Sequence, residues 1–209
     1  MNPLKTGKAY DTITERWTSS TFNRHNGIAQ HKRALKFYGK PIEHAVALDV
    51  GCGCTGRFFE LLGEEGFALE GIDASEKMLA LLEAQNHKCT LYHGDICTFA
   101  LPRQYDFITA WDSIWHVPLA HQSALITKLC NALKPGGVLI FTCGGTEEAG
   151  EHTNRTMGPE VYYASVGING FIQTVLDTGC YCRHVEYDQH PELHTYIIAQ
   201  RPTLAGCDD

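Results

Sequence analysis

The feature that most restricts the fold is an apolar run that leads straight into a glycine-rich turn: AVALDV at residues 45–50, then GCGCTG at 51–56. An apolar stretch without polar alternation is typical of a strand buried on both faces. The next segment, 55–66, carries phenylalanines and leucines at helical spacing, with Thr55 at the expected cap and a glycine at its end. A buried strand, a tight turn and a helix in this order predict the first unit of a parallel α/β sheet.

The same alternation continues along the chain. Further strands are expected at 67–72, 89–93, 105–111, 138–143, 180–187 and 194–200, the last two as an antiparallel pair. Further helices are expected at 24–39, at 76–85 after the cap Ser75, around 125–133 and at 169–179. The predicted fold class is α/β: a Rossmann-like, doubly wound seven-stranded sheet, mostly parallel with an antiparallel last strand, in a three-layer αβα sandwich.

Composition and charge argue against several partners. The formal net charge is -7 at pH 7 and no basic run is longer than the Lys32–Arg33 pair, so neither nucleic acid nor an anionic membrane is expected as a partner. No apolar run has the length of a membrane span, and residues 1–17 lack the apolar core of a secretory signal. The 9 cysteines are odd in number and scattered, which favours reduced thiols and a cytoplasmic location.

Ligand-binding residues are expected where the strands end, because open α/β sheets bind ligands at the carboxyl ends of their strands. The loop 51–56 matches the spacing of a dinucleotide fingerprint, and Asp73 ends the next strand, where a carboxylate accepts from ribose hydroxyls. On this pattern alone the loop suits several nucleotides, NAD among them. Asp49 favours a ligand with positive charge, such as an ammonium or a sulfonium. After the third strand, Asp95 can accept from an exocyclic amine while Ile96 lies against a purine.

Five stretches in this order resemble the class I S-adenosylmethionine-dependent methyltransferases, nearest to the broad small-molecule (type 11-like) subgroup. They are LDVGCGCTGRF, EGIDAS, GDI, YDFITAWDSIWHV and LKPGGVLIF, and they cover about residues 45–143. The resemblance implies S-adenosylmethionine as cofactor, S-adenosylhomocysteine as its product, and a sheet that ends in antiparallel strands. Residues outside the shared motifs, 1–40 and 144–170, are expected to select the substrate.

The resemblance also implies a cofactor-binding set. Its members are Asp49, Gly51, Cys52, Gly53, Asp73, Ala74, Asp95, Ile96, Ala110 and Trp111. In that set the glycines admit the methionine moiety, and Asp49 orients the loop or the ammonium group. Asp73 takes the ribose hydroxyls, and Asp95 addresses the adenine.

Two groups of possible metal ligands are better explained without a metal. Cys52 and Cys54 are separated by one glycine, whereas zinc sites favour two to four residues between cysteines and a second ligand pair. These thiols are expected to pack as small hydrophobic side chains. In 186-EYDQHPELH-194, alternate acidic and histidine side chains would share one face of a straight strand, but Pro191 favours a polar hairpin. No metal site is predicted.

The loop after the fourth strand, 111-WDSIWHVP-118, is the expected position of the methyl acceptor. Methyl transfer from a sulfonium is an in-line displacement in which positioning supplies much of the rate, and a general base is needed only when the acceptor proton must leave first. His116 and Asp112 are the candidate catalytic bases, with His116 preferred because its pKa suits neutral pH. Trp111 and Trp115 would wall the pocket, since an aromatic face attracts a methyl sulfonium. The alternative is that residues 115–116 only open the next helix and pack on the core.

Two segments outside the motifs are expected to flank the site. The connection 144–170 is long for a strand-to-helix link and is expected to act as a lid or specificity element. The N-terminal arm carries Tyr10, Trp17 and Phe22, which are expected to fold over the cofactor. Apart from the strand-four loop, the candidate substrate residues are His152, Arg155 and Tyr162; within that loop the candidate is Trp115.

The predicted organisation is a single domain over 1–209. It comprises an N-terminal cap or arm at 1–40, a cofactor-binding core at 41–143, a lid or substrate loop at 144–170, and a final helix with the antiparallel strand pair at 171–209. The predicted function is S-adenosylmethionine-dependent methyl transfer to an unidentified small-molecule acceptor, by a monomer or homodimer. The alternatives are a non-catalytic S-adenosylmethionine-binding module and, less favoured, an NAD-dependent oxidoreductase.

Overall fold

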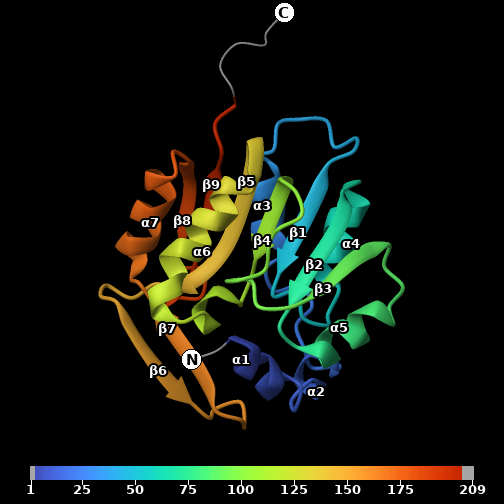
Figure 1. The fold of residues 1–209 in the computed structure, drawn as a ribbon, viewed down its shortest axis with the longest axis vertical. Coiled ribbons are helices and arrows are strands. Elements are labelled where there is room, and N and C mark those ends of the chain that lie inside the picture. The colour runs from blue at the N-terminus through green and yellow to red at the C-terminus, as the bar shows by residue number, and fades with distance from the viewer. Residues whose placement is uncertain (1–2, 204–209) are drawn as a thin grey trace, which may run out of the picture.

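The computed structural model describes residues 3–203, and a seven-stranded sheet forms its centre (Figure 1). The strand order is β3-β2-β1-β4-β5-β9-β8. β9 is antiparallel to both of its neighbours, and the other neighbouring strands are parallel. The strands are β1 (Val46–Val50), β2 (Ala68–Asp73), β3 (Cys89–His93), β4 (Tyr105–Ala110), β5 (Leu133–Gly144), β8 (Tyr181–Glu186) and β9 (His194–Gln200). The predicted doubly wound sheet with an antiparallel last strand is confirmed.

Helices cover both faces of this sheet and give the predicted three layers (Figure 1). One face carries α3 (Ile28–Leu35), α4 (Arg57–Glu64) and α5 (Glu76–Glu83), and the other carries α6 (Leu119–Asn131) and α7 (Ile168–Asp177). Two short helices, α1 (Pro3–Tyr10) and α2 (Glu15–Thr18), lie below the sheet in Figure 1, and a 3-10 turn, η1 (Ile114–His116), follows β4.

The burial of β1 explains why the sequences of the strands are continuous apolar runs. Val46, Leu48 and Val50 pack in the core beneath α6 and α7, whereas Ala47 packs in the core beneath α3, α4 and α5. Successive side chains of a strand point to opposite faces, so a strand covered on both sides has to be apolar almost throughout. Asp49 is the polar exception, and it lies where the strand reaches the open end of the sheet.

The strand order reverses at β1, which lies between β2 and β4. The chain leaves β1 toward β2 and later returns to the other side of β1 as β4. Loops that leave neighbouring strands in opposite directions open a crevice at the carboxyl ends of those strands. The crevice therefore lies next to the glycine loop that follows β1.

Several local predictions need correction. α3 occupies residues 28–35 and not 24–39, because Gly27 precedes it with a left-handed φ of 85°. Gly56, with φ 68°, is the cap of α4 and makes no side-chain cap bond, so Thr55 is not the cap. The prediction for Ser75 is confirmed, since its side chain accepts a hydrogen bond from the Met78 N–H at the start of α5.

Residues 144–170 hold a β-hairpin rather than an irregular loop. β6 (Gly150–Asn154) and β7 (Val161–Ser165) pair antiparallel as a separate two-stranded sheet, at the lower left of Figure 1. β7 is mostly buried, whereas β6 is mostly exposed. The polar sequence of β6, GEHTN, has no apolar alternation that would indicate a strand. The four-part division of the chain stays a prediction.

None of the helices within residues 3–203 combines the length and hydropathy of a membrane span. The cysteines in the same part of the chain form no disulfide. Cys207 lies outside the described residues.

Candidate active site

A cavity of about 460 Å³ opens at the carboxyl ends of β1, β2 and β4. Its sheet side is made by the glycine loop 51–53, by residues 73–74 and by residues 111–117. α1 and α2 close it from the opposite side through Gly7, Tyr10 and other residues of the N-terminal arm. The volume lies in the range of roughly 300–1,000 Å³ that is usual for small-molecule sites.

The glycine loop is shaped by contacts that only glycine allows. Gly51 has φ 72°, and a Cβ on it would lie 2.4 Å from the Cβ of Ser113, so the loop after β1 packs directly against the loop after β4. Gly53 has φ 56°, and a Cβ there would meet nothing within 4 Å. The backbone at Gly53 is therefore open to the cavity, and a ligand can approach it closely.

Asp73 is held in one orientation by the backbone. Its Oδ2 accepts from the Gly53 N–H at 2.8 Å, and its Oδ1 accepts from the Ser75 N–H, also at 2.8 Å. Burial raises the pKa of Asp73, and these backbone hydrogen bonds oppose the rise. Each carboxylate oxygen has a second lone pair. Asp73 can therefore accept from two adjacent hydroxyl groups of a ligand in the cavity.

Asp49 differs from Asp73 because its carboxylate accepts no hydrogen bond from the described residues. The residue is 4% exposed, lines the cavity, and makes no side-chain hydrogen bond to any residue between 3 and 203. Burial raises its pKa to about 7, with the positive charge of Arg57 acting in the opposite direction. A cationic group in the cavity would favour the ionised form of Asp49.

Two predicted cofactor residues do not belong to the cavity lining of the described chain. Asp95 is engaged in its own turn, where Oδ1 accepts from the Cys97 N–H at 2.8 Å, and among the described residues it does not line the cavity, whereas Ile96 does. Ala110 is fully buried within β4. The predicted cofactor residues that do line the cavity are Asp49, Gly51, Cys52, Gly53, Asp73, Ala74, Ile96 and Trp111.

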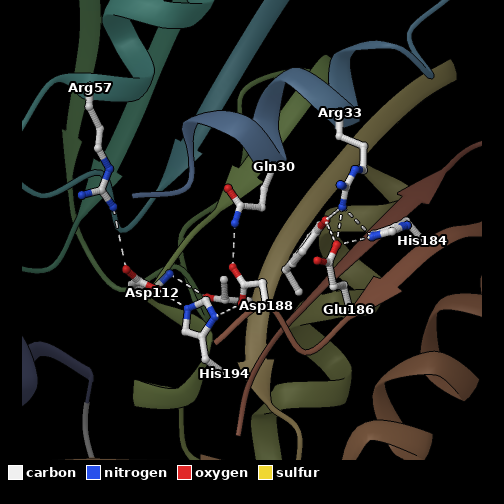
Figure 2. Close-up of polar contacts among 10 residues, drawn as sticks. Gln30, Arg33, Arg57, Asp112, His184, Glu186, Asp188 and His194 are labelled. Atoms are coloured by element: carbon white, nitrogen blue, oxygen red, sulfur yellow. Dashed lines mark hydrogen bonds and ion pairs between the residues drawn. The ribbon is translucent and has the colours of Figure 1, made fainter. Parts of the chain in front are cut away.

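Asp112 belongs to a chain of polar contacts that crosses the site. Its Oδ1 lies 3.0 Å from Nε2 of His194, and Nδ1 of the same ring lies 2.5 Å from Oδ1 of Asp188. Figure 2 shows His194 between the two carboxylates, with Arg57 beyond Asp112 and Gln30 beyond Asp188. A ring that donates to a carboxylate from both nitrogens is an imidazolium. The two carboxylates accordingly raise the pKa of His194 against the effect of burial.

The backbone at Asp112 is unusual as well. Its φ is 56°, in the left-handed region that residues other than glycine seldom adopt. The Asp112 N–H donates to Oγ1 of Thr142 at 2.7 Å, and this bond fixes the loop after β4 against β5. In this conformation Oδ1 of Asp112 contacts Nε2 of His194.

His116 is a neutral ring with both nitrogens engaged. Its Nδ1 lies 2.9 Å from the Tyr162 carbonyl and donates to it, since a carbonyl only accepts. Nε2 then accepts, from the Tyr10 hydroxyl at 2.7 Å and from the Trp115 indole N–H at 3.1 Å. Burial lowers the pKa of His116 to about 4. Both His116 and Trp115 line the cavity, as does Asp112.

The remaining predicted substrate residues lie in the β6–β7 hairpin, outside the cavity lining of the described chain. His152 stacks on Tyr163, with ring centroids 5.4 Å apart, and Arg155 lies 3.6 Å from the Glu160 carboxylate on the exposed surface. Tyr162 places its hydroxyl against Glu151. Its neighbour Tyr163 faces the cavity instead. Adjacent strand residues point to opposite faces, so choosing between the two tyrosines required the register of β7.

Arg57 and His194 are among the cavity residues that the sequence analysis did not predict as site residues. Arg57 follows the glycine loop directly and is 7% exposed. His194 was predicted to end a polar hairpin and to begin the strand 194–200, and it does begin β9, which runs antiparallel to β5 and therefore starts at the end of the sheet where β1 and β4 finish. Because Arg57 directly follows the glycine loop, its position in the sequence could have indicated that it lines the cavity. The position of His194 depends on strand order, which no local pattern records.

Curated relatives of this chain include proteins named as methyltransferases. The dTDP-3-amino-3,6-dideoxy-alpha-D-glucopyranose N,N-dimethyltransferase of Streptomyces fradiae is 33% identical over 124 residues, which is 52% of this chain and 48% of that protein. Phosphoethanolamine N-methyltransferase 2 of Caenorhabditis elegans is 27% identical over 126 residues, which is 57% of this chain and 28% of that protein. The chain thus spans less than half the length of these curated relatives.

Solved structures agree with the fold. Magnesium protoporphyrin IX methyltransferase from Synechocystis PCC 6803, crystallised with bound SAM, has a TM-score of 0.69 at 15% identity, over 96% of this chain and 98% of that one. A family described as "Methyltransferase domain" matches residues 23–165, more than half of the chain, and this range includes the glycine loop, Asp73 and the loop after β4. The resemblance expected from the motifs is confirmed, and this chain belongs to the methyltransferase domain family.

Proposed function

We propose that this chain transfers a methyl group from S-adenosylmethionine to a small-molecule acceptor by in-line displacement and releases S-adenosylhomocysteine. The observation that carries the proposal is the pair of cavity carboxylates on either side of the open glycine loop: Asp49 has no hydrogen-bond partner among residues 3–203, and Asp73 has lone pairs to spare. Such a cavity suits a ligand that carries both a positive charge and two neighbouring hydroxyl groups, as S-adenosylmethionine does.

In this proposal each wall of the cavity binds one part of the cofactor. Asp73 accepts from the ribose hydroxyls, and Asp49 receives the ammonium group of the methionine moiety. Ala74 and Ile96 pack on the adenine, and Trp111 borders the methionine end. The cofactor supplies an electrophilic methyl group. The contribution of the chain is to hold the acceptor in line with that group and to exclude water.

Of the two predicted bases, His116 is the better placed. Asp112 already binds His194, whereas Nε2 of His116 accepts from the Tyr10 hydroxyl, and Tyr10 itself lines the cavity. An acceptor proton that moves to the Tyr10 oxygen displaces the Tyr10 proton onto Nε2, so the pair carries one proton away from the acceptor. The lowered pKa of His116, about 4, removes the reason for which the sequence analysis preferred it, a pKa near neutrality, and makes His116 a weak base. The proton path therefore suits only an acceptor that turns strongly acidic as it is methylated, such as an amine nitrogen.

The N-terminal arm acts as the cap of the bound cofactor. Gly7 packs so closely that a Cβ on it would lie 2.0 Å from the Ala74 carbonyl oxygen. Asp11 accepts from the Ser75 hydroxyl at 2.5 Å and from the Lys77 N–H at 3.1 Å. These contacts hold α1 against the start of α5, with Tyr10 directed to His116. The arm at 1–40 and the segment 144–170 would thus enclose the acceptor, as the predicted division of the chain implies.

The acceptor class fits the names of the relatives, which are N-methyltransferases of an amino sugar and of phosphoethanolamine. From these names we take only the class of acceptor that we propose for this chain, a small molecule with an amine nitrogen. The net charge of -7 disfavours nucleic acid as a substrate. The free thiols of residues 3–203 fit a cytoplasmic location, and the active species is a monomer or homodimer.

Calorimetry and turnover together test the proposal. The purified protein should bind S-adenosylhomocysteine and S-adenosylmethionine but not NAD, and a panel of small amines should include one that yields S-adenosylhomocysteine. Binding of NAD without S-adenosylmethionine would replace the proposal with an oxidoreductase. Tight cofactor binding with no turnover on any acceptor class would favour a binding module.

A further inference from the structure

Gln122 is a fully buried amide that joins three segments of the chain next to the cavity. It lies in the first turn of α6 and is 0% exposed. Its Nε2 donates to the Ala164 carbonyl of β7 at 2.8 Å, and to the Ile114 and Val117 carbonyls of the loop after β4 at 3.2 and 3.3 Å. Its Oε1 accepts from the Val166 N–H at 3.0 Å. Donors and acceptor of the amide are therefore all used within the protein.

These bonds complete the edge of β7 that faces away from β6. β6 pairs with β7 along one edge, and the backbone groups of alternate strand residues point to the same edge. The Tyr162 carbonyl, the Ala164 carbonyl and the Val166 N–H follow one another at intervals of two residues, and side chains take the place of a neighbouring strand beside them. His116 contacts the first of these groups, and Gln122 contacts the other two. Gln122 therefore holds the register of β7 against His116.

The bond to the Tyr162 carbonyl decides which nitrogen of His116 carries the proton. A carbonyl only accepts, so at 2.9 Å it keeps the proton on Nδ1 and leaves Nε2 as the acceptor for the Tyr10 hydroxyl. If β7 slipped by one residue, its carbonyls would turn to the opposite edge, and Nδ1 would lose this partner. A ring with its proton on Nε2 cannot accept from Tyr10, and the proton path is then closed.

Gln122 does not belong to the cavity lining of the described chain, so its contribution to the site passes through its neighbours. Resting on the proposed function, we propose that Gln122 is a positioning residue for methyl transfer: it holds β7 in the register in which the Tyr162 carbonyl fixes the Nδ1–H tautomer of His116. The same register directs Tyr163 into the cavity, where its ring centre lies 4.9 Å from that of His116. The loop after β4 and the β6–β7 hairpin thus form one wall of the acceptor site.

The test is Gln122→Met, which keeps the length of the side chain and removes every hydrogen bond of the amide. In wild-type protein with isotope-labelled histidine, NMR should find the proton of His116 on Nδ1, and loss of the signals in His116→Gln assigns them. In Gln122→Met the Nε2–H tautomer should become the major form. With the best amine of the panel above, kcat should fall about tenfold as the fraction of the active tautomer falls, while affinity for S-adenosylhomocysteine stays within about threefold. Retained affinity also shows that the variant is folded.

A double variant separates positioning from a general loss of structure. Tyr10→Phe already closes the proton path, so adding Gln122→Met to it should change kcat by less than about twofold. A purely structural defect would instead multiply the two losses.

The matched control is Gln200→Met, at the end of β9. Gln200 also joins distant segments through its amide: Nε2 donates to the Phe37 and Gly136 carbonyls at 2.6 and 3.2 Å, and Oε1 accepts from Nε of Arg183 at 2.8 Å. It lies outside the cavity lining formed by residues 3–203. Gln200→Met should lower the unfolding temperature but leave the tautomer of His116 and kcat unchanged.

The outcomes separate this inference from the proposed function. If wild-type protein forms no S-adenosylhomocysteine from any amine, the proposed function fails and takes this inference with it. If wild-type protein turns over but carries the proton of His116 on Nε2, the inference alone is overturned, even where Gln122→Met does not fold. It is also overturned if Gln122→Met keeps the tautomer and kcat of wild-type protein.

Discussion

At the scale of single residues, Asp49 is expected to determine how cofactor affinity depends on pH. Burial raises its pKa to about 7, so at neutral pH a large share of ligand-free molecules carry it protonated. Only the ionised carboxylate attracts an ammonium group. We expect affinity for S-adenosylhomocysteine, measured by calorimetry, to rise about tenfold between about pH 6 and 7.5 as the carboxylate ionises.

The matched variant is Asp49→Asn, which keeps the shape of the side chain and removes its titration. Its affinity should be weaker at about pH 7.5 and nearly constant down to about pH 6. A pH dependence that persists in this variant would assign the titration to another group and contradict the role given to Asp49.

Tyr10 and His116 are expected to act as one unit. Tyr10→Phe keeps the ring next to Trp17 but removes the hydroxyl that reaches Nε2 of His116. kcat should fall about 100-fold, the low end for loss of a general base, while affinity for S-adenosylhomocysteine stays within about threefold. His116→Gln should cost a similar factor in kcat. The double variant should be no slower than either single one, because both remove the same proton path.

Tyr38→Phe is the control for this series, since the Tyr38 hydroxyl donates to Asp106 at 3.1 Å, outside the cavity lining. It should leave kcat unchanged. Unchanged kcat in Tyr10→Phe, or full additivity in the double variant, would remove the proton path from the mechanism.

Position relative to strand ends decides which site residues were predictable. Asp49 and Asp73 stand at the ends of apolar runs, so an α/β pattern alone brings them to one edge of the sheet. Asp95 also follows a strand and accepts from the backbone two residues on, as Asp73 does, but it does not belong to the cavity lining of the described chain. His194 reaches the cavity only because β9 pairs with β5 so that His194 lies opposite Gly144.

At the scale of elements, the docking of α1 on α5 offers a direct test of the cap. Gly7→Ala would place a Cβ 2.0 Å from the Ala74 carbonyl oxygen, and backbone cannot easily yield there, so α1 should be displaced. The contact of Asp11 with Ser75 should be lost with it. We expect affinity for S-adenosylhomocysteine to drop about tenfold, comparable to losing one hydrogen bond to a charged group.

Hydrogen exchange is the structural readout for this variant. Amides of residues 3–20 should exchange faster, whereas those of β1 and β4 should stay protected. Gly39→Ala is the matched control, because a Cβ at Gly39 meets nothing within 4 Å. If Gly7→Ala binds the cofactor as tightly as wild-type protein, α1 is not a cap.

The elements differ in how far sequence could predict them. β1, β2 and β4 are apolar because both faces are covered, and Ser75 supplies a cap that local chemistry dictates. The β6–β7 hairpin has no such signal, since β6 is exposed and polar on both faces. Its pairing depends on the buried face of β7 packing near η1 and β5, which are distant in the chain.

At the scale of the whole molecule, contacts between distant segments complete the site. Gln30 of α3 donates to Asp188 at 2.7 Å, and Arg33 of the same helix pairs with Glu186 (Figure 2). These contacts join the N-terminal part of the chain to its last strands. Strand order and such long-range pairs follow from the packing of the complete chain. Local sequence motifs therefore predicted the glycine loop as a cofactor loop, but they did not predict the network around His194.

The stability of the molecule at acid pH should depend on His31, which α3 buries against the sheet. The ring is 0% exposed, its Nδ1 donates to the Gly27 carbonyl at 2.7 Å, and its Nε2 lies 2.7 Å from Oγ1 of Thr109. Burial lowers the pKa of His31 to about 3, so the folded protein keeps the ring neutral. The unfolded chain takes up a proton near pH 6.5. The contribution of the neutral ring is therefore present above about pH 6.5 and is lost as the pH falls toward the folded-state pKa.

Because Asp49 titrates in the opposite sense, the pH profile of wild-type protein alone does not isolate this effect. Because the pKa of Asp49 is raised in the folded state, Asp49 contributes to the free energy of unfolding below about pH 4. This contribution is lost as the pH rises through about 7. His31→Gln removes one titration and leaves the other. Its destabilisation relative to wild-type protein, measured by urea unfolding, should be about 2 kcal/mol smaller at about pH 5 than at about pH 7.5. Ala34→Gly, a buried substitution in the same helix that does not titrate, should cost the same at both pH values. If His31→Gln destabilised the protein by the same amount at both pH values, the folded protein would accept the proton on His31. His31 would then not limit stability in acid.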